Sequence, residues 1–291
     1  MAGMNRWLIG ARPRTLPAAV VPVALGAAAA VGEPGSVWWR IGPALIVSLA
    51  LQVGVNYAND YSDGVRGTDE VRVGPVRLVG SGLASPGAVK RAALAAFGVA
   101  ALAGLGLAAA TSWWLLAVGA AALLAGWGYT GGPKPYGYLG LGEVFVFVFF
   151  GLVATAGSCY VVCERVTAVA WLAGCAAGCL ACALLVVNNL RDIPTDREVG
   201  KRTLAVRLGD GPTRLFYIAL LLLAVGLVVA ISILDRPLAA IGAAGLLVAV
   251  PAVKAIRGGA KGTALIPVLG TTGKVQLATG LLAAVGMAIS G

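Results

Sequence analysis

Long stretches without a charged residue constrain this chain more than any other feature of its sequence. They cover residues 15–32, 41–59, 92–133, 144–163, 166–190, 215–234, 237–253 and 275–291. A helix needs about 20 apolar residues to cross roughly 30 Å of hydrocarbon. The third stretch has 42 residues, enough for two spans joined at Thr111 and Ser112. The pattern therefore predicts an all-α membrane protein, with nine transmembrane helices in one bundle and a single domain over residues 1–291.

The composition supports a membrane protein. Only 12% of the residues are charged and 59% are hydrophobic, whereas soluble domains are about 25% charged. The chain contains no histidine, which excludes a histidine base and a histidine-ligated haem. Its five cysteines lie between Cys159 and Cys182, and we interpret them as small packing residues of two helices.

The distribution of Lys and Arg predicts the orientation of the helices, because cytoplasmic loops carry an excess of these residues. With the N-terminus in the cytoplasm, the inner segments hold 19 of the 22 basic residues, and the outer segments hold only Arg40, Arg165 and Arg236. We expect a multi-pass protein of the plasma membrane whose long charged loops, residues 60–90 and 192–213, are cytoplasmic. The net charge of +10 then belongs to loops beside the lipid bilayer and indicates no nucleic-acid partner.

Two aspartate pairs stand where uncharged stretches end: Asp60 with Asp63, and Asp192 with Asp196, 132 residues later. Charged groups at membrane depth are costly unless they are compensated, so such residues indicate a functional site. Both pairs fall on the predicted cytoplasmic side. We therefore expect them to form one active site at that face of the bundle.

An asparagine precedes each pair at helical spacing. If the second span continues as a helix, Asn56, Asp60 and Asp63 share one face, because they stand at positions i, i+4 and i+7. In the second motif Asn188 stands four residues before the first aspartate. There Pro194 is expected to kink or restart the helix between the two aspartates.

Oxygen donors without His or Cys are the ligands that Mg²⁺ prefers, commonly together with substrate phosphates. Four carboxylates and a diphosphate would repel strongly in a partly desolvated site unless cations compensated them. Nearby basic residues are Arg66, Arg72, Arg77, Lys134, Lys201 and Arg202. The pattern predicts a magnesium–diphosphate site whose metal ligands are Asn56, Asp60, Asp63, Asn188, Asp192 and Asp196.

Several neighbouring residues have two interpretations. Glu143 opens the fifth predicted span, where the helix dipole favours an acid, or it has a catalytic role. Tyr129, Tyr136 and Tyr138 fit an aromatic belt at the membrane interface as well as a substrate pocket. Lys134 is either an ordinary charge of the inner side or a diphosphate ligand.

With these motifs the chain resembles the UbiA superfamily of intramembrane aromatic prenyltransferases, and within it the branch that prenylates 1,4-dihydroxy-2-naphthoate. The resemblance covers nearly the whole chain and rests on ARPRTLPAAVVPVALG from Ala11, NDYSDGVRGTDE from Asn59, GPVRLVGSG from Gly74, YTGGPKPYGYLGLGE from Tyr129 and NNLRDIPTDREVGKRTLAVRLG from Asn188. NDxxD with a later DxxxD is typical of the superfamily. The other motifs are similar to the naphthoate branch.

The resemblance implies a Mg²⁺-dependent transfer of a polyprenyl group from polyprenyl diphosphate to the naphthoate ring, with loss of the carboxylate, to give demethylmenaquinone. It implies that the four aspartates hold the metal with support from the two asparagines. The diphosphate-binding residues would be Arg66, Arg77, Lys134, Lys201 and Arg202, and the acceptor would meet Arg12 and Tyr129.

Two departures from the family pattern affect these roles. Many members have a third aspartate four residues after NDxxD, where this chain has Gly67, and the next acid is Asp69. A Lys-Arg pair common after the fourth helix is here Lys134 followed by Pro135, so only the lysine is carried over. Whether Asp69 reaches the metal stays open.

Other functions are weaker interpretations of the same residues. A CDP-alcohol phosphotransferase would need two further aspartates soon after Gly64, and they are missing. A cation-coupled transporter would place its acids near the middle of the membrane on broken helices, not at helix ends. Another aromatic acceptor, such as 4-hydroxybenzoate or homogentisate, remains an alternative, and the prenyl chain length, the base that activates the ring hydroxyl and the oligomeric state do not follow from the sequence.

Overall fold

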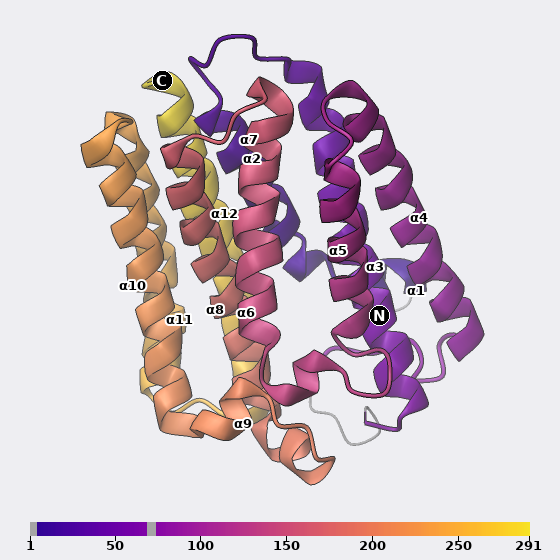
Figure 1. Ribbon diagram of the computed structural model, residues 1–291. Helices are drawn as coiled ribbons and strands as arrows, with labels where there is room; N and C mark the ends of the chain where they lie inside the picture. Colours follow the sequence, from indigo (N-terminus) through magenta and orange to yellow (C-terminus); the bar gives the residue numbers. More distant parts are fainter. Residues whose placement is uncertain (1–4, 69–73) are drawn as a thin grey trace.

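The computed structural model describes residues 5–68 and 74–291, and in these ranges it contains helices and no β-strand. Figure 1 shows the helices side by side in one bundle. They are α1 (Arg6–Ala11), α2 (Pro17–Ala29), α3 (Ile41–Val65), α4 (Pro86–Ala110), α5 (Leu115–Gly128), α6 (Gly142–Val146), α7 (Ala154–Cys163), α8 (Ala168–Glu198), α9 (Leu204–Leu208), α10 (Asp210–Leu234), α11 (Gly245–Arg257) and α12 (Leu265–Ile289).

Seven helical segments within the described ranges are long and apolar enough to cross a membrane. They are Trp38–Val65, Pro86–Ala110, Gly142–Cys163, Ala168–Glu198, Asp210–Leu234, Pro237–Arg257 and Gly262–Ile289. The two remaining predicted spans correspond to the shorter apolar helices α2 and α5. The thirteen residues of α2 rise only about 20 Å, and a 3₁₀ turn at Pro13–Thr15 precedes them. The count of nine complete spans therefore stays a prediction.

Helix boundaries agree with the uncharged stretches in some places and differ in others. Helix α4 ends just before Thr111, as predicted. The last span was predicted to begin after Lys274, but α12 begins at Leu265 and passes through this lysine, which is exposed. The long aliphatic stem of a lysine lets its ammonium reach toward the interface, so one charge does not end a membrane helix.

Helix α8 lies at the centre of the bundle, and 78% of its apolar 18-residue stretch is buried. The prediction of a restart at Pro194 was wrong, since α8 continues through this residue to Glu198. Packing against neighbouring helices supports a proline inside a membrane helix. Both aspartates of the second motif therefore stand on one continuous helix.

Glycines bring the segment Phe147–Val153, which is a π-helix between α6 and α7, close to α8. A Cβ atom added at Gly151 would lie 2.5 Å from the Cα atom of Gly178 and 2.8 Å from the carbonyl oxygen of Gly174. Small residues allow this close approach of helix backbones in membranes. Short π-helical stretches are frequent at functional sites, and this one forms part of a cavity wall.

The alternation of helix directions brings both aspartate motifs to the same end of the bundle. The C-terminal ends of α3 and α8 lie at the end that also carries α9, at the bottom of Figure 1. The short connection at Trp38–Arg40 and the loop after Cys163 lie at the opposite end, where Arg40 contacts Glu164 at 2.8 Å. Sequence segments 132 residues apart thus share one face.

We predict that Gly151→Ala destabilises the protein by about 1–3 kcal/mol, the usual cost of overpacking. The added methyl would press on the backbone of α8, which cannot move as a flexible side chain would. The measurement is thermal unfolding in detergent. Gly226→Ala is the control, because its Cβ would meet nothing within 4 Å, and it should be neutral or stabilising by about 0.5–1 kcal/mol. Equal unfolding temperatures for the two variants would contradict the packing argument.

Candidate active site

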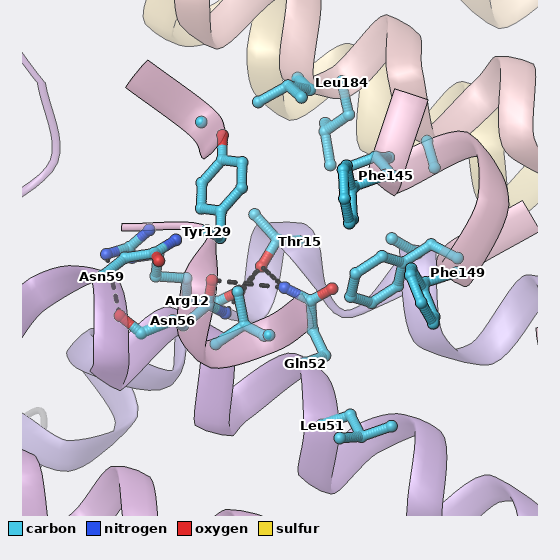
Figure 2. A pocket seen from close by; sticks show the side chains of 18 of the residues that line it. Arg12, Thr15, Leu51, Gln52, Asn56, Asn59, Tyr129, Phe145, Phe149 and Leu184 are labelled. Carbon is cyan, nitrogen blue, oxygen red and sulfur yellow. Dashed lines mark hydrogen bonds between the residues drawn. The ribbon is translucent and has the colours of Figure 1, made fainter. Parts of the chain in front are cut away.

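A cavity of about 800 Å³ opens at the end of the bundle that carries the aspartate motifs. Figure 2 shows part of its wall, with Arg12, Asn56, Asn59 and Tyr129 near one another and Phe145 and Phe149 on the other side. Its charged lining residues are Arg12, Arg14, Asp63, Arg77, Asp192, Asp196 and Lys201, and most of the rest of its wall is apolar. A pocket with a few convergent polar groups and an apolar interior is typical of a ligand site.

One face of α3 lines the cavity along most of the helix. The lining positions are Ala44, Val47, Ser48, Leu51, Gln52, Val55, Asn56, Asn59 and Asp63. Their spacing follows the helical repeat, which places such residues on one side. The apolar members lie toward the N-terminal end and the amides and the acid toward the C-terminal end, so the helix itself divides the cavity into an apolar and a polar part.

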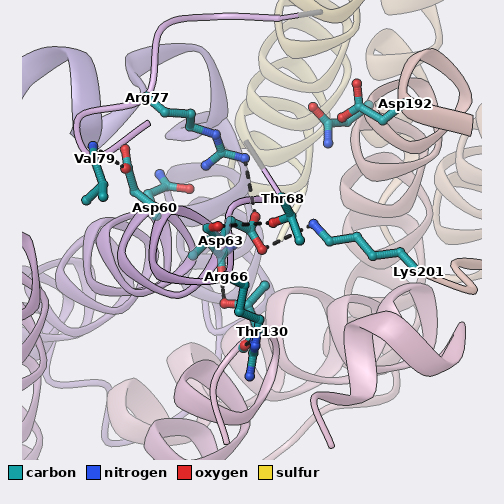
Figure 3. Close-up of polar contacts among 12 residues, drawn as sticks. Asp60, Asp63, Arg66, Thr68, Arg77, Val79, Thr130, Asp192 and Lys201 are labelled. Atoms are coloured by element: carbon teal, nitrogen blue, oxygen red, sulfur yellow. Dashed lines mark hydrogen bonds and ion pairs between the residues drawn. The ribbon is translucent and has the colours of Figure 1, made fainter. Parts of the chain in front are cut away.

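Asp63 is the centre of the polar part. Its carboxylate accepts a hydrogen bond from the Tyr138 hydroxyl at 2.7 Å and from Lys201 Nζ at 3.1 Å, and Arg77 Nη2 lies 3.9 Å away. Figure 3 shows Arg77 and Lys201 reaching Asp63 from separate segments. The Asp63 side chain is only 5% exposed. A buried carboxylate needs such compensation. Its contact with Lys201 joins the first motif to the segment that follows the second.

Asp63 contributes to the raised pKa values of two neighbouring groups, Lys201 and Tyr138. Burial lowers the pKa of Lys201, but the negative charges of Asp63 and Asp196 raise it by more, so the pKa lies above the ordinary lysine value. Burial and then the nearby Asp63 carboxylate raise the pKa of Tyr138. Both groups therefore keep their protons at neutral pH, one as a cation and the other as a neutral hydrogen-bond donor.

Asp60 has a different environment from the one predicted. It is fully buried, does not line the cavity, and accepts hydrogen bonds from the backbone amides of Leu78 at 2.9 Å and Val79 at 3.0 Å. Those amides belong to the loop that carries Arg77. The helical phase explains the difference, because Asn59 and Asp63 stand at i and i+4 and face the cavity together, while Asp60 points toward the loop.

Asn59 is a cavity residue that the sequence analysis did not single out. Its Oδ1 atom accepts a hydrogen bond from the Thr130 hydroxyl at 2.8 Å. The signal was present in the sequence, since Asn59 stands four residues before Asp63. Asn56 also lines the cavity, but its Nδ2 atom bonds to the Ala11 carbonyl at 2.9 Å and to Thr15 Oγ1 at 3.0 Å.

The second motif is organised by an arginine that the sequence analysis also missed. Arg191 donates to Asp192 through Nε and Nη2, each at 2.7 Å, and to Asn188 Oδ1 at 2.8 Å. It is 3% exposed, and the backbone at Gly74 lies against its guanidinium. A bidentate Arg–carboxylate pair fixes geometry as well as charge. Its sequence signal is the adjacent pair Arg-Asp in NNLRD.

The other predicted basic residues differ in their positions. Arg77 and Lys201 line the cavity, whereas Arg66, Lys134 and Arg202 do not. Arg66 donates to the carbonyls of Thr130 and Gly132 and lies over the Tyr138 ring. It therefore ties the end of α3 to the next loop. The side chains of Lys134 and Arg202 are exposed, and the predicted Arg72 and Asp69 lie outside the described residues.

The N-terminal segment adds a further cation to the wall. Arg12 lines the cavity, donates to the carbonyl of Asn56 at 3.1 Å and has a φ of 53°. Left-handed backbone at a non-glycine residue is costly and often marks a functional site. Tyr129 also lines the cavity. Both residues predicted to meet an acceptor therefore lie in its wall.

Glu143 is buried and does not line the cavity. Its carboxylate accepts a hydrogen bond from Asn189 Nδ2 at 2.9 Å, and Asn189 does line the cavity. Of the two interpretations of Glu143, this contact favours a role through another residue, since the acid orients the Asn189 amide. Tyr136 and Tyr138 line the cavity as well, which favours the pocket interpretation for these tyrosines.

The donor atoms of the polar part fit Mg²⁺. Among the residues that the structure describes, no three His, Cys, Asp or Glu side chains are grouped closely enough to hold a metal ion alone. Mg²⁺ does not require such a group, because it is commonly bound through one or two carboxylates plus substrate phosphates. Asn59 and Asp63 on α3, and Asp192 and Asp196 on α8, which carry amide and carboxylate oxygens, line the same cavity.

Comparison with known proteins agrees with this architecture. The chain is 51% identical to 1,4-dihydroxy-2-naphthoate octaprenyltransferase of Mycobacterium tuberculosis, over 98% of this chain and 97% of that one. It is 47% identical to the enzyme of the same name from Mycobacterium leprae, over 100% and 99%.

The fold agrees with that of a UbiA homolog from Archaeoglobus fulgidus bound to GPP and Mg²⁺. The TM-score is 0.67 at 16% identity, over 97% of this chain and 100% of that one. The model of the UbiA prenyltransferase family matches residues 19–265. The predicted resemblance is confirmed, and this chain belongs to the UbiA prenyltransferase family.

Proposed function

We propose that the protein transfers a polyprenyl group from polyprenyl diphosphate to 1,4-dihydroxy-2-naphthoate, with loss of carbon dioxide, to form demethylmenaquinone. One observation carries the proposal: a polar mouth with acids and bases continues into a long apolar interior. A prenyl diphosphate has the same division, with an anionic head and an apolar tail. The names of the relatives that are 51% and 47% identical support the naphthoate as acceptor.

The diphosphate binds at the polar mouth. Arg77 and Lys201 already lie beside Asp63, so two cations are positioned for the phosphate oxygens. We assign Mg²⁺ binding to Asn59, Asp63, Asp192 and Asp196, and when bound the metal would neutralise the charge of the departing diphosphate. Of the other predicted ligands, Asn56, Asp60 and Asn188 position their neighbours through the hydrogen bonds described above.

The acceptor binds where Arg12 and Tyr129 line the wall. The Arg12 guanidinium pairs with the carboxylate of the naphthoate, which leaves the ring facing the allylic carbon. The allylic C–O bond breaks with its electron pair going to the diphosphate, and the ring carbon that bears the carboxylate forms the new C–C bond. Carbon dioxide then leaves, and its bonding electrons return to the ring. The apolar wall excludes water from the allylic cation.

We place the polar mouth on the cytoplasmic side of the plasma membrane. The proposal rests on the basic residues, 19 of which belong to segments on that side, in agreement with the positive-inside rule. The whole chain, residues 1–291, acts as one domain. The prenyl tail lies at the depth of the hydrocarbon core of the membrane.

The acceptor is tested with purified protein in detergent, Mg²⁺ and octaprenyl diphosphate. With 1,4-dihydroxy-2-naphthoate we expect release of diphosphate and carbon dioxide in equal amounts, because the new bond replaces the carboxylate. The measurements are a diphosphate assay and carboxyl-labelled substrate. Parallel reactions contain 4-hydroxybenzoate or homogentisate. Turnover with one of these and none with the naphthoate would reject the acceptor and keep the enzyme class.

The acids of the polar mouth are tested by substitution. Asp63→Asn and Asp192→Asn should each lower kcat/KM by about 10²–10³-fold, the size of effect seen when one electrostatic contact to a developing charge is removed. Asp235→Asn is the control, because this acid pairs with Arg236 at the far end of the bundle. Near-normal turnover of either mouth variant would argue against the site.

The Lys201 ion pair predicts a pH dependence of stability. A raised lysine pKa means that the pair stabilises the fold fully below the ordinary value of 10.5 and less as the pH rises through the raised pKa. Lys201→Met should therefore lower the free energy of unfolding by about 1.5–3 kcal/mol at neutral pH. The difference in stability between the variant and the wild type should become smaller above pH 10.5. Unfolding temperatures of both proteins across pH measure this. Exposed Lys254→Met should show no such trend, and a constant difference for Lys201 would refute the assignment.

A further inference from the structure

The cavity extends through almost the whole apolar depth of the bundle. Its lining on α3 runs from Asp63 to Ala44, and these twenty residues rise about 28 Å. The hydrocarbon core of a bilayer is roughly 30 Å thick. A ligand whose head is held at Asp63 can therefore extend its tail inside the protein nearly to the opposite membrane face.

Arg40 lies beyond the far end of the cavity and is not one of its lining residues. It stands one helical turn beyond Ala44 and is 9% exposed. Its guanidinium donates to the carbonyls of Ala110 at 2.6 Å and Val161 at 3.1 Å, and to the Glu164 carboxylate at 2.8 Å. These contacts tie the ends of α3, α4 and α7 together. Of the residues in these contacts, Val161 lines the cavity.

Three glycines leave room in the apolar part of the cavity. Gly104 in α4, Gly119 in α5 and Gly157 in α7 line the cavity. A Cβ at Gly119 or Gly157 would meet nothing within 4 Å, and at Gly104 it would meet only Val47 Cγ2, at 3.9 Å. No close helix packing requires glycine at these positions, in contrast to Gly151. Glycine inside a helix costs about 0.5–1 kcal/mol of stability relative to alanine. Since packing does not require glycine here, we expect the space that these glycines leave to have a function.

The walls around these glycines offer nothing polar to a ligand. Leu107 and Leu115 line the same region. The two hydroxyls present are already bonded, Ser48 to the carbonyl of Ala19 at 2.8 Å and Ser158 to that of Ala154 at 2.6 Å. The compartment therefore suits an uninterrupted hydrocarbon tail.

We propose that this outer compartment holds the distal isoprene units of the prenyl chain, and that Gly104, Gly119 and Gly157 determine the longest chain that the enzyme accepts. The Arg40–Glu164 pair lies beyond the end of this compartment. The inference rests on the proposed prenyl transfer. It adds that chain-length selection is located in glycines remote from the diphosphate.

The test is a comparison of Gly104→Leu and Gly157→Leu with wild type, using geranyl diphosphate and octaprenyl diphosphate as substrates. A leucine fills the compartment without touching the polar mouth. We expect kcat/KM for octaprenyl diphosphate to fall by about tenfold or more, equivalent to the usual cost of overpacking. Turnover of geranyl diphosphate, whose short tail ends before the compartment, should stay within about twofold.

The matched control is Gly106→Leu, on the same helix as Gly104. Gly106 is exposed, lies outside the cavity, and its Cβ would meet nothing within 4 Å. The control should leave both substrates unchanged. The graded variants Gly104→Ala and Gly104→Val, which are smaller than leucine, should lower octaprenyl turnover in order of side-chain volume.

The outcomes separate this inference from the proposed function. Unchanged octaprenyl turnover in both leucine variants would overturn the compartment, while the enzyme activity itself would stand. An equal fall with both substrates would also overturn it, because the effect would then concern the fold or the polar mouth. Absence of prenyl transfer by the wild-type protein would reject the proposed function instead.

Discussion

The Asp63 carboxylate joins parts of the chain that are remote in sequence, and the arrangement of the polar mouth depends on it. Tyr138 comes from the loop before α6, Lys201 from the segment after α8, and Arg77 from the loop after α3. Without these partners a carboxylate so deeply buried would carry a large desolvation cost. The same contacts hold two cations, Arg77 and Lys201, at the opening of the cavity. There an anionic headgroup can replace Asp63 as their partner.

Charge spacing predicts much of this fold because the membrane restricts the chain to helices that must be long and uncharged. The turn between α4 and α5 was confirmed on that basis. The rule fails where a local contact outweighs it. Helix α2 is short and follows a 3₁₀ turn at Pro13–Thr15, and α12 includes Lys274 because the side chain of an exposed lysine reaches past apolar surface.

The site was predictable to the extent that helical spacing determines direction. Spacing placed Asp63, Asp192 and Asp196 toward a common cavity. It did not separate Asp60 from Asn59, because adjacent residues on a helix point about 100° apart and either phase satisfies the motif. Nor could it reveal that Lys134 and Arg202 lie outside the cavity wall, since their positions depend on loops whose paths the sequence pattern does not determine.

The polar and apolar parts of the cavity demand different kinds of residues, and α3 supplies both from one face. Near Asp63, buried charges are held in place by hydrogen bonds from several loops, so a change there disturbs the whole mouth. Near Ala44, the wall has only van der Waals contacts and satisfied hydroxyls. The size of the apolar part can therefore change by one glycine at a time without cost to the chemistry. In a membrane enzyme built this way, reactivity and tail length are set by separate residues along a single helix-lined cavity.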